Sequence, residues 1–153
     1  MLWLTSQVLA APLVIFAGEA EIAADPAAVQ EALLDFDAYA EWNPWLTSAV
    51  GEPLPGATVA ATVRFDEGER VVRHRVLVVE PATFCWEDLG AFTVVARGQR
   101  CRELVEVPGG TEIHVELSVR GPLKGLVERR YGEELRRFSQ AELEALKVYV
   151  EGG

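Results

Sequence analysis

Residues 122–150 constrain the fold of this chain more than any other stretch, because their pattern predicts one long amphipathic helix. Gly121 and Pro122 supply the break that precedes it. The opposite face carries charged side chains, with Glu133 four residues before Arg137 in the favourable orientation. Apolar side chains recur on one face at the helical period: Leu123, Val127, Tyr131, Leu135, Phe138, Ala141, Ala145, Leu146 and Tyr149. Such a stripe must be buried, so the rest of the chain has to provide a surface that covers it.

The composition is that of a globular protein with a core of its own. The 153 residues correspond to one domain, half of them apolar and a quarter charged. The formal net charge of −10 argues against a nucleic-acid partner, because phosphate binding needs a basic surface. An anionic membrane would also repel the chain, and we expect no stable membrane insertion and no cofactor.

Two features bear on where the protein works. Cys85 and Cys101 lack the spacing of metal ligands, and we expect two free buried thiols in a reducing, cytoplasmic location. Residues 1–18 carry no charged side chain, which raises the possibility of a signal peptide or anchor. They lack a basic leading segment, and polar residues interrupt the apolar run. We therefore interpret residues 1–12 as an N-terminal extension of a single domain at 13–151.

Most of the chain before the terminal helix has the alternation of β-strands. Residues 13–23 form the first predicted strand, and Asp25 and Pro26 then begin a short helix as its cap and first residue. A second helical piece is predicted over 35–42. Further strands are predicted at 58–65, 70–80, 84–86, 92–96, 100–107 and 111–120. This order predicts an α+β protein in which the terminal helix covers one face of an antiparallel sheet.

Several motifs, in this order and spacing, resemble the START-like (SRPBCC) superfamily and within it the polyketide cyclase/dehydrase-like branch. They are A-D-P-A-A-V at 24–29, D-F-D-A-Y-A-E-W-N-P-W at 35–45, V-L-V-V-E-P at 76–81 with Trp86 following, the Gly-Gly-Thr turn at 109–111, and A-L-K-V-Y-V-E at 145–151. The resemblance covers roughly residues 14 to 151. It implies a helix-grip fold, a curved antiparallel sheet of about six to seven strands wrapped around the C-terminal helix, with two short helices after the first strand.

The resemblance also implies a cavity between sheet and helix. Relatives use this cavity for apolar or aromatic small molecules such as lipids, sterols and polyketides. Some relatives catalyse aromatic cyclisation or dehydration, whereas many only bind a ligand. The superfamily has no shared catalytic motif, so the resemblance carries over no catalytic residue.

One departure from the superfamily pattern concerns charge. Where relatives often have Gly-x-His-x-Phe, this chain has Arg100 and Arg102 in residues 98–102. Alternation places both arginines on one face and Cys101 on the other, but a bulge near Gly98 would reverse the assignment. Arginines that point inward need partners. Glu134 and Glu142 of the terminal helix are the candidates, so the arginines are either structural ion pairs or anchors for an anionic ligand group.

Other candidate site residues come from the aromatic and histidine content. His74 is an acid or base candidate, although its arginine neighbours favour a surface position; His114 lies on the polar face of the last strand. The two histidines do not suggest a metal. Tyr131 is the best candidate for a polar contact within the helix stripe. The other side chains that form either plain core or a ligand wall are Trp42, Trp45, Phe65, Trp86, Phe92, Leu135 and Phe138.

Three functions remain open at this stage. The first is binding or carriage of an apolar or aromatic small molecule, lipid- or polyketide-like, by a monomer or homodimer. The second is a metal-free cyclase or dehydratase that uses the same cavity, with His74, Arg100, Arg102 and Tyr131 as candidates for its chemistry. The third is a protein-interaction module, which would need an apolar patch on the exterior.

Overall fold

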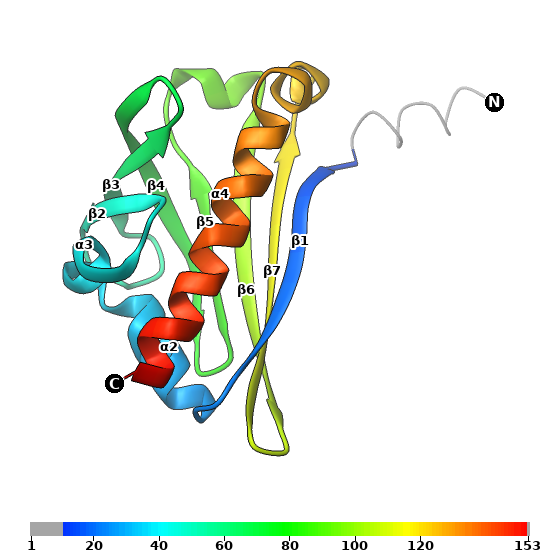
Figure 1. Cartoon of the computed structure of the whole chain (residues 1–153). Coiled ribbons are helices and arrows are strands. Elements are labelled where there is room, and N and C mark those ends of the chain that lie inside the picture. Colours follow the sequence, from blue (N-terminus) through cyan, green and yellow to red (C-terminus); the bar gives the residue numbers. More distant parts are fainter. Residues whose placement is uncertain (1–10, 153) are drawn as a thin grey trace.

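The computed structural model describes residues 11–152, and it shows a seven-stranded antiparallel sheet that curves around one long helix (Figure 1). The strand order is β1-β7-β6-β5-β4-β3-β2. The elements are β1 (Leu13–Ile22), α2 (Pro26–Leu34), η1 (Phe36–Ala38), α3 (Tyr39–Trp42), β2 (Leu46–Val50), β3 (Thr58–Phe65), β4 (Gly68–Glu80), β5 (Thr83–Asp88), η2 (Ala91–Val94), β6 (Arg97–Val107), β7 (Gly110–Arg120) and α4 (Lys124–Gly152). This is the predicted α+β helix-grip fold.

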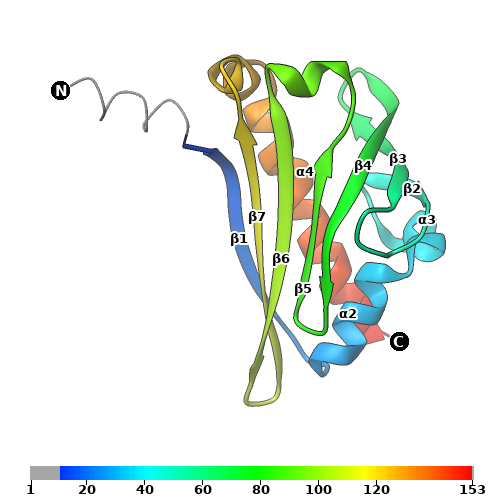
Figure 2. The same cartoon turned by 180° about the vertical axis from the view of Figure 1, so that it is seen from behind.

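The helix α4 covers one face of the sheet only. Figure 2, seen from behind, shows β4 to β7 in front of α4, while α2 lies near the C-terminal end of α4. From β2 to β7 each strand pairs with the next strand along the chain, whereas β1 lies at the edge beside β7. The two short helical pieces thus follow the first edge strand and lead the chain to β2 at the other edge.

The predicted helix cap is confirmed. The Asp25 side chain accepts a hydrogen bond from the Ala28 backbone N–H at 2.9 Å, and Pro26 occupies the first turn of α2. The helical piece predicted over 35–42 is present at residues 36–42, divided into η1 and α3. Local chemistry was therefore sufficient to locate where this part of the chain turns.

Two strand assignments differ from the prediction. Residues 92–96 were expected to form a strand, but η2 occupies most of them as a 3-10 helix. Phe92 and Val94 imitate strand alternation, yet both are exposed, and the positive φ of Gly90 turns the chain away from β5. The short edge strand β2 was not predicted, because Asn43 and Pro44 just before it favour an extended or turn conformation.

The expectation of two free thiols is wrong. Cys85 of β5 and Cys101 of β6 face each other in register and form a disulfide, with Cα atoms 4.1 Å apart. Sequence spacing did not reveal the pair, because only the register of the two strands brings the sulfurs together. The inference of a reducing compartment loses its basis, since disulfides are typical of oxidising compartments, and the cytoplasmic location stays a prediction.

The question of a targeting segment or anchor falls mostly on residues 1–10, which lie outside the described part of the chain. Among residues 11–152, no helix combines enough length with enough apolar character to cross a bilayer.

The two halves of α4 pack differently. Leu146 of the predicted stripe is fully buried, and so is Leu143, which the predicted stripe did not include. Val127, Leu135 and Phe138 of the stripe are only partly buried. The C-terminal half of α4 therefore packs tightly, and the N-terminal half faces space between the helix and the sheet.

The turn from β7 into α4 depends on Gly121, which gives a test of the fold. Its φ is +115°, and a Cβ would collide with the Val95 carbonyl oxygen. We expect Gly121→Ala to lower the free energy of unfolding by roughly 1–3 kcal/mol in chemical denaturation. Gly125→Ala is the matched control, because a Cβ there meets nothing and alanine favours the helix. Equal stability of the two variants would contradict this account of the turn.

Candidate functional site

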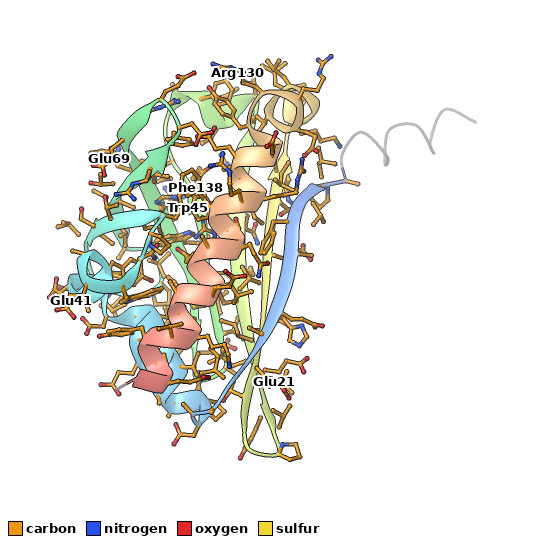
Figure 3. All side chains as sticks on the ribbon, in the orientation of Figure 1. Glu21, Glu41, Trp45, Glu69, Arg130 and Phe138 are labelled. Carbon is orange, nitrogen blue, oxygen red and sulfur yellow. A yellow bond between two sulfur atoms is a disulfide. The ribbon has the colours of Figure 1, made fainter. Side chains whose placement is uncertain are left out.

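A cavity of about 440 Å³ lies between the sheet and the N-terminal half of α4. Phe92 and Arg70 line it and are exposed, so it reaches solvent at the end near η2. The lining residues are mostly apolar: Trp45, Leu46, Val63, Phe65, Arg70, Val72, His74, Asp88, Phe92, Ala96, Gly98, Arg100, Leu117, Val119, Val127, Tyr131 and Leu135. Figure 3 labels Trp45 and Phe138 beside α4, and their rings stack with centroids 6.5 Å apart.

Arg100 lines the cavity and is 5% exposed. Its Nη1 donates to Oε1 of Glu142 at 3.0 Å, and its guanidinium lies 3.9 Å from the centroid of the Trp45 ring. β6 pairs with both neighbours without a register shift, so the bulge that would have turned the arginine outward does not form. The structure therefore selects the inward orientation among the two that the sequence left open.

Arg102 also points inward, but it lies behind the cavity wall. It is 1% exposed, its guanidinium sits over the rings of Phe84 and Trp86, and its Nη2 is 3.8 Å from Oε1 of Glu142. Its Nε and Nη1 have no hydrogen-bond partner among the described residues. Burial, reinforced by the charge of Arg100, lowers the pKa of Arg102 to about 10, so the side chain still carries its charge at pH 7.

Glu142 joins the arginines to the start of β2. Its Oε2 accepts a hydrogen bond from Nδ2 of Asn43 at 2.8 Å. The side-chain oxygen of Asn43 in turn accepts from the backbone N–H groups of Trp45 and Leu46, at 3.0 and 2.9 Å. One buried carboxylate thus connects α4, β6 and the segment that positions Trp45 on the cavity wall.

The other glutamate proposed as an arginine partner lies elsewhere. Glu134 accepts a hydrogen bond from the backbone N–H of Asp66, in the turn between β3 and β4. It does not line the cavity. Helical periodicity could not predict this partner of Glu134, because the turn between β3 and β4 reaches the helix only in the folded chain.

His74 lines the cavity, and its expected surface position is wrong. It is 5% exposed because alternation along β4 turns Arg73 and Arg75 outward and the histidine inward. Its ring stacks on Trp86 with centroids 4.4 Å apart, and Nε2 lies 3.2 Å from Oδ1 of Asp88. Nδ1 has no hydrogen-bond partner among the described residues. The histidine and its carboxylate have the geometry of an oriented proton-transfer pair.

Most of the predicted site residues converge, and some do not. Those on the cavity wall are Trp45, Phe65, His74, Phe92, Arg100, Tyr131 and Leu135. Those outside the lining are Trp42, Trp86, Arg102, Glu134 and Phe138. Trp42 stacks on Tyr149 at the far end of α4, with ring centroids 5.6 Å apart, and is part of the packed half of the helix.

Two charged residues on the wall were missed. Asp88 ends β5, and the hydrogen side chain of Gly98 leaves room for its carboxylate, since a Cβ there would collide with it. Arg70 places its guanidinium 4.5 Å from the Phe65 ring centroid and 5.9 Å from that of Tyr131. Asp88 could have been identified from its position opposite His74 in the pairing of β4 with β5, but that position is known only once the strand register is known.

One group of described side chains has the composition and spacing of a metal site. Glu19, Glu112 and His114 place one ligand atom each within 4.8 Å of one another. They lie on the face of the sheet opposite α4, because alternation along β7 turns Ile113 and Val115 toward the core. The histidine already contacts both carboxylates, at 3.4 and 2.7 Å. The sequence did not indicate this group, because Glu19 belongs to β1 and comes beside His114 of β7 only through the pairing of the two strands.

Comparison with known proteins gives a family for most of the chain. Residues 14–151 match the profile of the family described as polyketide cyclase/dehydrase and lipid transport. No curated protein sequence matches significantly.

Solved structures share the fold at low sequence identity. The di-domain ARO/CYC StfQ from the steffimycin biosynthetic pathway superposes with a TM-score of 0.72 at 12% identity, over 92% of this chain and 52% of that one. This chain therefore spans about half the length of that relative. The Zhui aromatase/cyclase from Streptomyces sp. R1128 superposes with a TM-score of 0.70 at 17% sequence identity, over 89% of this chain and 92% of that one. Ara h 8.0201 superposes with a TM-score of 0.68 at 19% sequence identity, over 90% of this chain and 97% of that one.

The buried carboxylate gives the test of this site's architecture. Removing one partner of a buried ion pair leaves an uncompensated charge, so we expect Glu142→Ala to lower the free energy of unfolding by about 3–5 kcal/mol. Glu144→Ala is the control on the same helix, because Glu144 is exposed and its side chain accepts a hydrogen bond from the neighbouring Gln140. Its effect should stay within about 0.5 kcal/mol. Urea denaturation measures both, and a small loss for Glu142→Ala would contradict the bracing role.

Proposed function

Because the chain belongs to the polyketide cyclase/dehydrase and lipid transport family, we propose that it binds an apolar or aromatic small molecule in the cavity between the sheet and α4. The observation that carries the proposal is the cavity itself. Its volume of about 440 Å³ lies within the range of small-molecule sites. Its wall is mainly apolar, and a few polar side chains converge on it.

The residues of the cavity wall would make different kinds of contact with a ligand. Trp45, Phe65 and Tyr131 offer broad ring surfaces to a flat ligand, while Leu135 and its neighbours on α4 and β7 exclude water. Arg100 and His74 offer polar contacts at fixed positions, because Glu142 and Asp88 hold them. Tyr131 adds a hydroxyl near the solvent end, where Arg70 packs against its ring.

Filling the cavity gives the test of this proposal. Val127 lines the cavity from α4, so Val127→Trp should occupy ligand space and weaken binding of apolar aromatic compounds by at least about tenfold. Val148→Trp makes the same change at an exposed position of the same helix and should leave binding unchanged.

Native mass spectrometry of gently purified protein, followed by thermal-shift assays with lipids and polycyclic aromatics, measures both variants. The proposal fails if no member of either panel binds the unmodified protein, or if the two tryptophan variants bind equally well.

A second candidate function, catalysis of proton transfer in a cyclase or dehydratase, is favoured by the His74–Asp88 pair. The histidine lines the cavity, its Nδ1 has no hydrogen-bond partner within residues 11–152, and Asp88 contacts the other ring nitrogen, Nε2. A neutral imidazole held in this way can remove a proton next to a ligand carbonyl, and Arg100 can stabilise the enolate that forms. No metal takes part in this step as proposed.

Hydrogen–deuterium exchange of a bound β-diketone in D₂O tests the second function without knowledge of the natural substrate. If His74 moves the proton, NMR should show accelerated exchange at the carbon between the carbonyls, and His74→Gln should slow it by roughly 10²-fold or more. Binding of the diketone by the variant serves as the control. Exchange at the same rate in both proteins would exclude His74 as the base.

A further inference from the structure

The buried charges beside the cavity do not balance. Among the described residues, the charged residues that are buried are Arg100, Arg102 and Glu142, counting the histidine as neutral. Two guanidiniums thus share one carboxylate, and both contact the same oxygen of Glu142. The interior next to the cavity therefore carries an excess of one positive charge.

The other charges that face this region do not remove the excess. Asp88 lines the cavity, but its side chain is 41% exposed and water screens it. Arg70, also on the wall and exposed, is opposite in sign to Asp88 and offsets it. Tyr39 lies near the arginines, yet burial raises its pKa, so its hydroxyl is neutral. Protonation of His74 would only add positive charge.

Donor groups of the two arginines are also unused. Nε of Arg100 and both Nε and Nη1 of Arg102 are buried without a hydrogen-bond partner among residues 11–152. An uncompensated charge and unpaired donors in a low-dielectric interior both cost free energy, and a ligand can recover part of this cost. Since Arg100 is on the cavity wall, the cavity is where a compensating group can lie.

We propose that the ligand of this cavity is an acid: a flat apolar molecule whose anionic oxygen, a carboxylate or phenolate, lies against Arg100 and balances the excess charge of the Arg100–Arg102–Glu142 cluster. The apolar body then fills the space bounded by Trp45, α4 and β7. This inference rests on the proposed function, because it specifies the chemistry of a ligand that the cavity binds.

The cluster also explains why one arginine would not suffice. Arg100 alone is neutralised by Glu142 at 3.0 Å and would attract an anion weakly. Arg102 supplies the second charge from behind the wall, held over Phe84 and Trp86 without reaching the cavity. The preference for an anion is therefore set by a residue that the ligand does not touch.

A matched pair of probes tests the inference: 2-naphthoic acid, which is anionic at pH 7, and 2-naphthamide, which has nearly the same shape and no charge. Titrations of the unmodified protein should show the acid binding at least about tenfold more tightly than the amide. Equal or tighter binding of the amide overturns the inference while leaving the proposed function intact. Binding of neither probe counts against both.

Variants then locate the origin of the preference. Arg102→Met should bring the affinities for the acid and the amide close to equality by weakening the binding of the acid alone, because the cluster becomes neutral while the cavity wall is unchanged. Glu142→Gln should increase the preference for the acid, because the excess positive charge of the cluster rises from one to two. Arg97→Met, at an exposed position of the same strand, should leave it unchanged. Circular dichroism checks that each variant is folded. An unchanged preference in folded Arg102→Met or Glu142→Gln would overturn the charge-balance argument.

Discussion

The carboxylate of Glu142 is the contact on which the arrangement of the site depends. It accepts from Arg100 of β6 through one oxygen and from Asn43 through the other, and Asn43 fixes the first backbone amides of the segment that becomes β2. A buried carboxylate is costly to desolvate and is retained only when its partners are well placed. Helix, central sheet and edge strand are thereby held in one relative position.

That position explains why a cavity exists at all. The helix α4 packs against β1 and the short helices, and Leu143 and Leu146 in its C-terminal half are fully buried. In its N-terminal half, the stripe residues Val127 and Leu135 line the cavity. Well-packed interiors contain few such spaces, so an apolar cavity of this size indicates a site for a ligand.

Much of the fold follows from local pattern, whereas much of the site does not. The long terminal helix was predicted, but only Leu146 of its predicted stripe is fully buried, and the buried face of α4 also includes Gly132, Ser139, Glu142 and Leu143. The Asp25 cap and the alternation in β7 are short-range signals, and each was predicted correctly. The same alternation placed Arg100 and Arg102 on one face. Choosing between the inner and outer face required knowing that β6 has no bulge, which is a property of its pairing with β5 and β7.

Two of the missed contacts share a cause. The Cys85–Cys101 bond and the His74–Asp88 pair are both cross-strand contacts, set by register and invisible in spacing along the chain. His74 was placed outside because of its arginine neighbours, although strand geometry turns adjacent residues to opposite faces. Residues 92–96 were misread because exposed apolar side chains at η2 imitate a strand. One of these side chains, Phe92, lines the cavity.

Methyl NMR during titration with an aromatic compound shows whether a ligand occupies the space under the N-terminal half of α4. The largest chemical-shift changes are expected for Val63, Leu117, Val127 and Leu135 on the cavity wall, with ligand-to-methyl nuclear Overhauser effects to the same groups. The methyl signals of Val50 and Val148, which are exposed and do not line the cavity, should not change. Shifts centred on those exposed positions, with none at the wall, would contradict binding in this cavity.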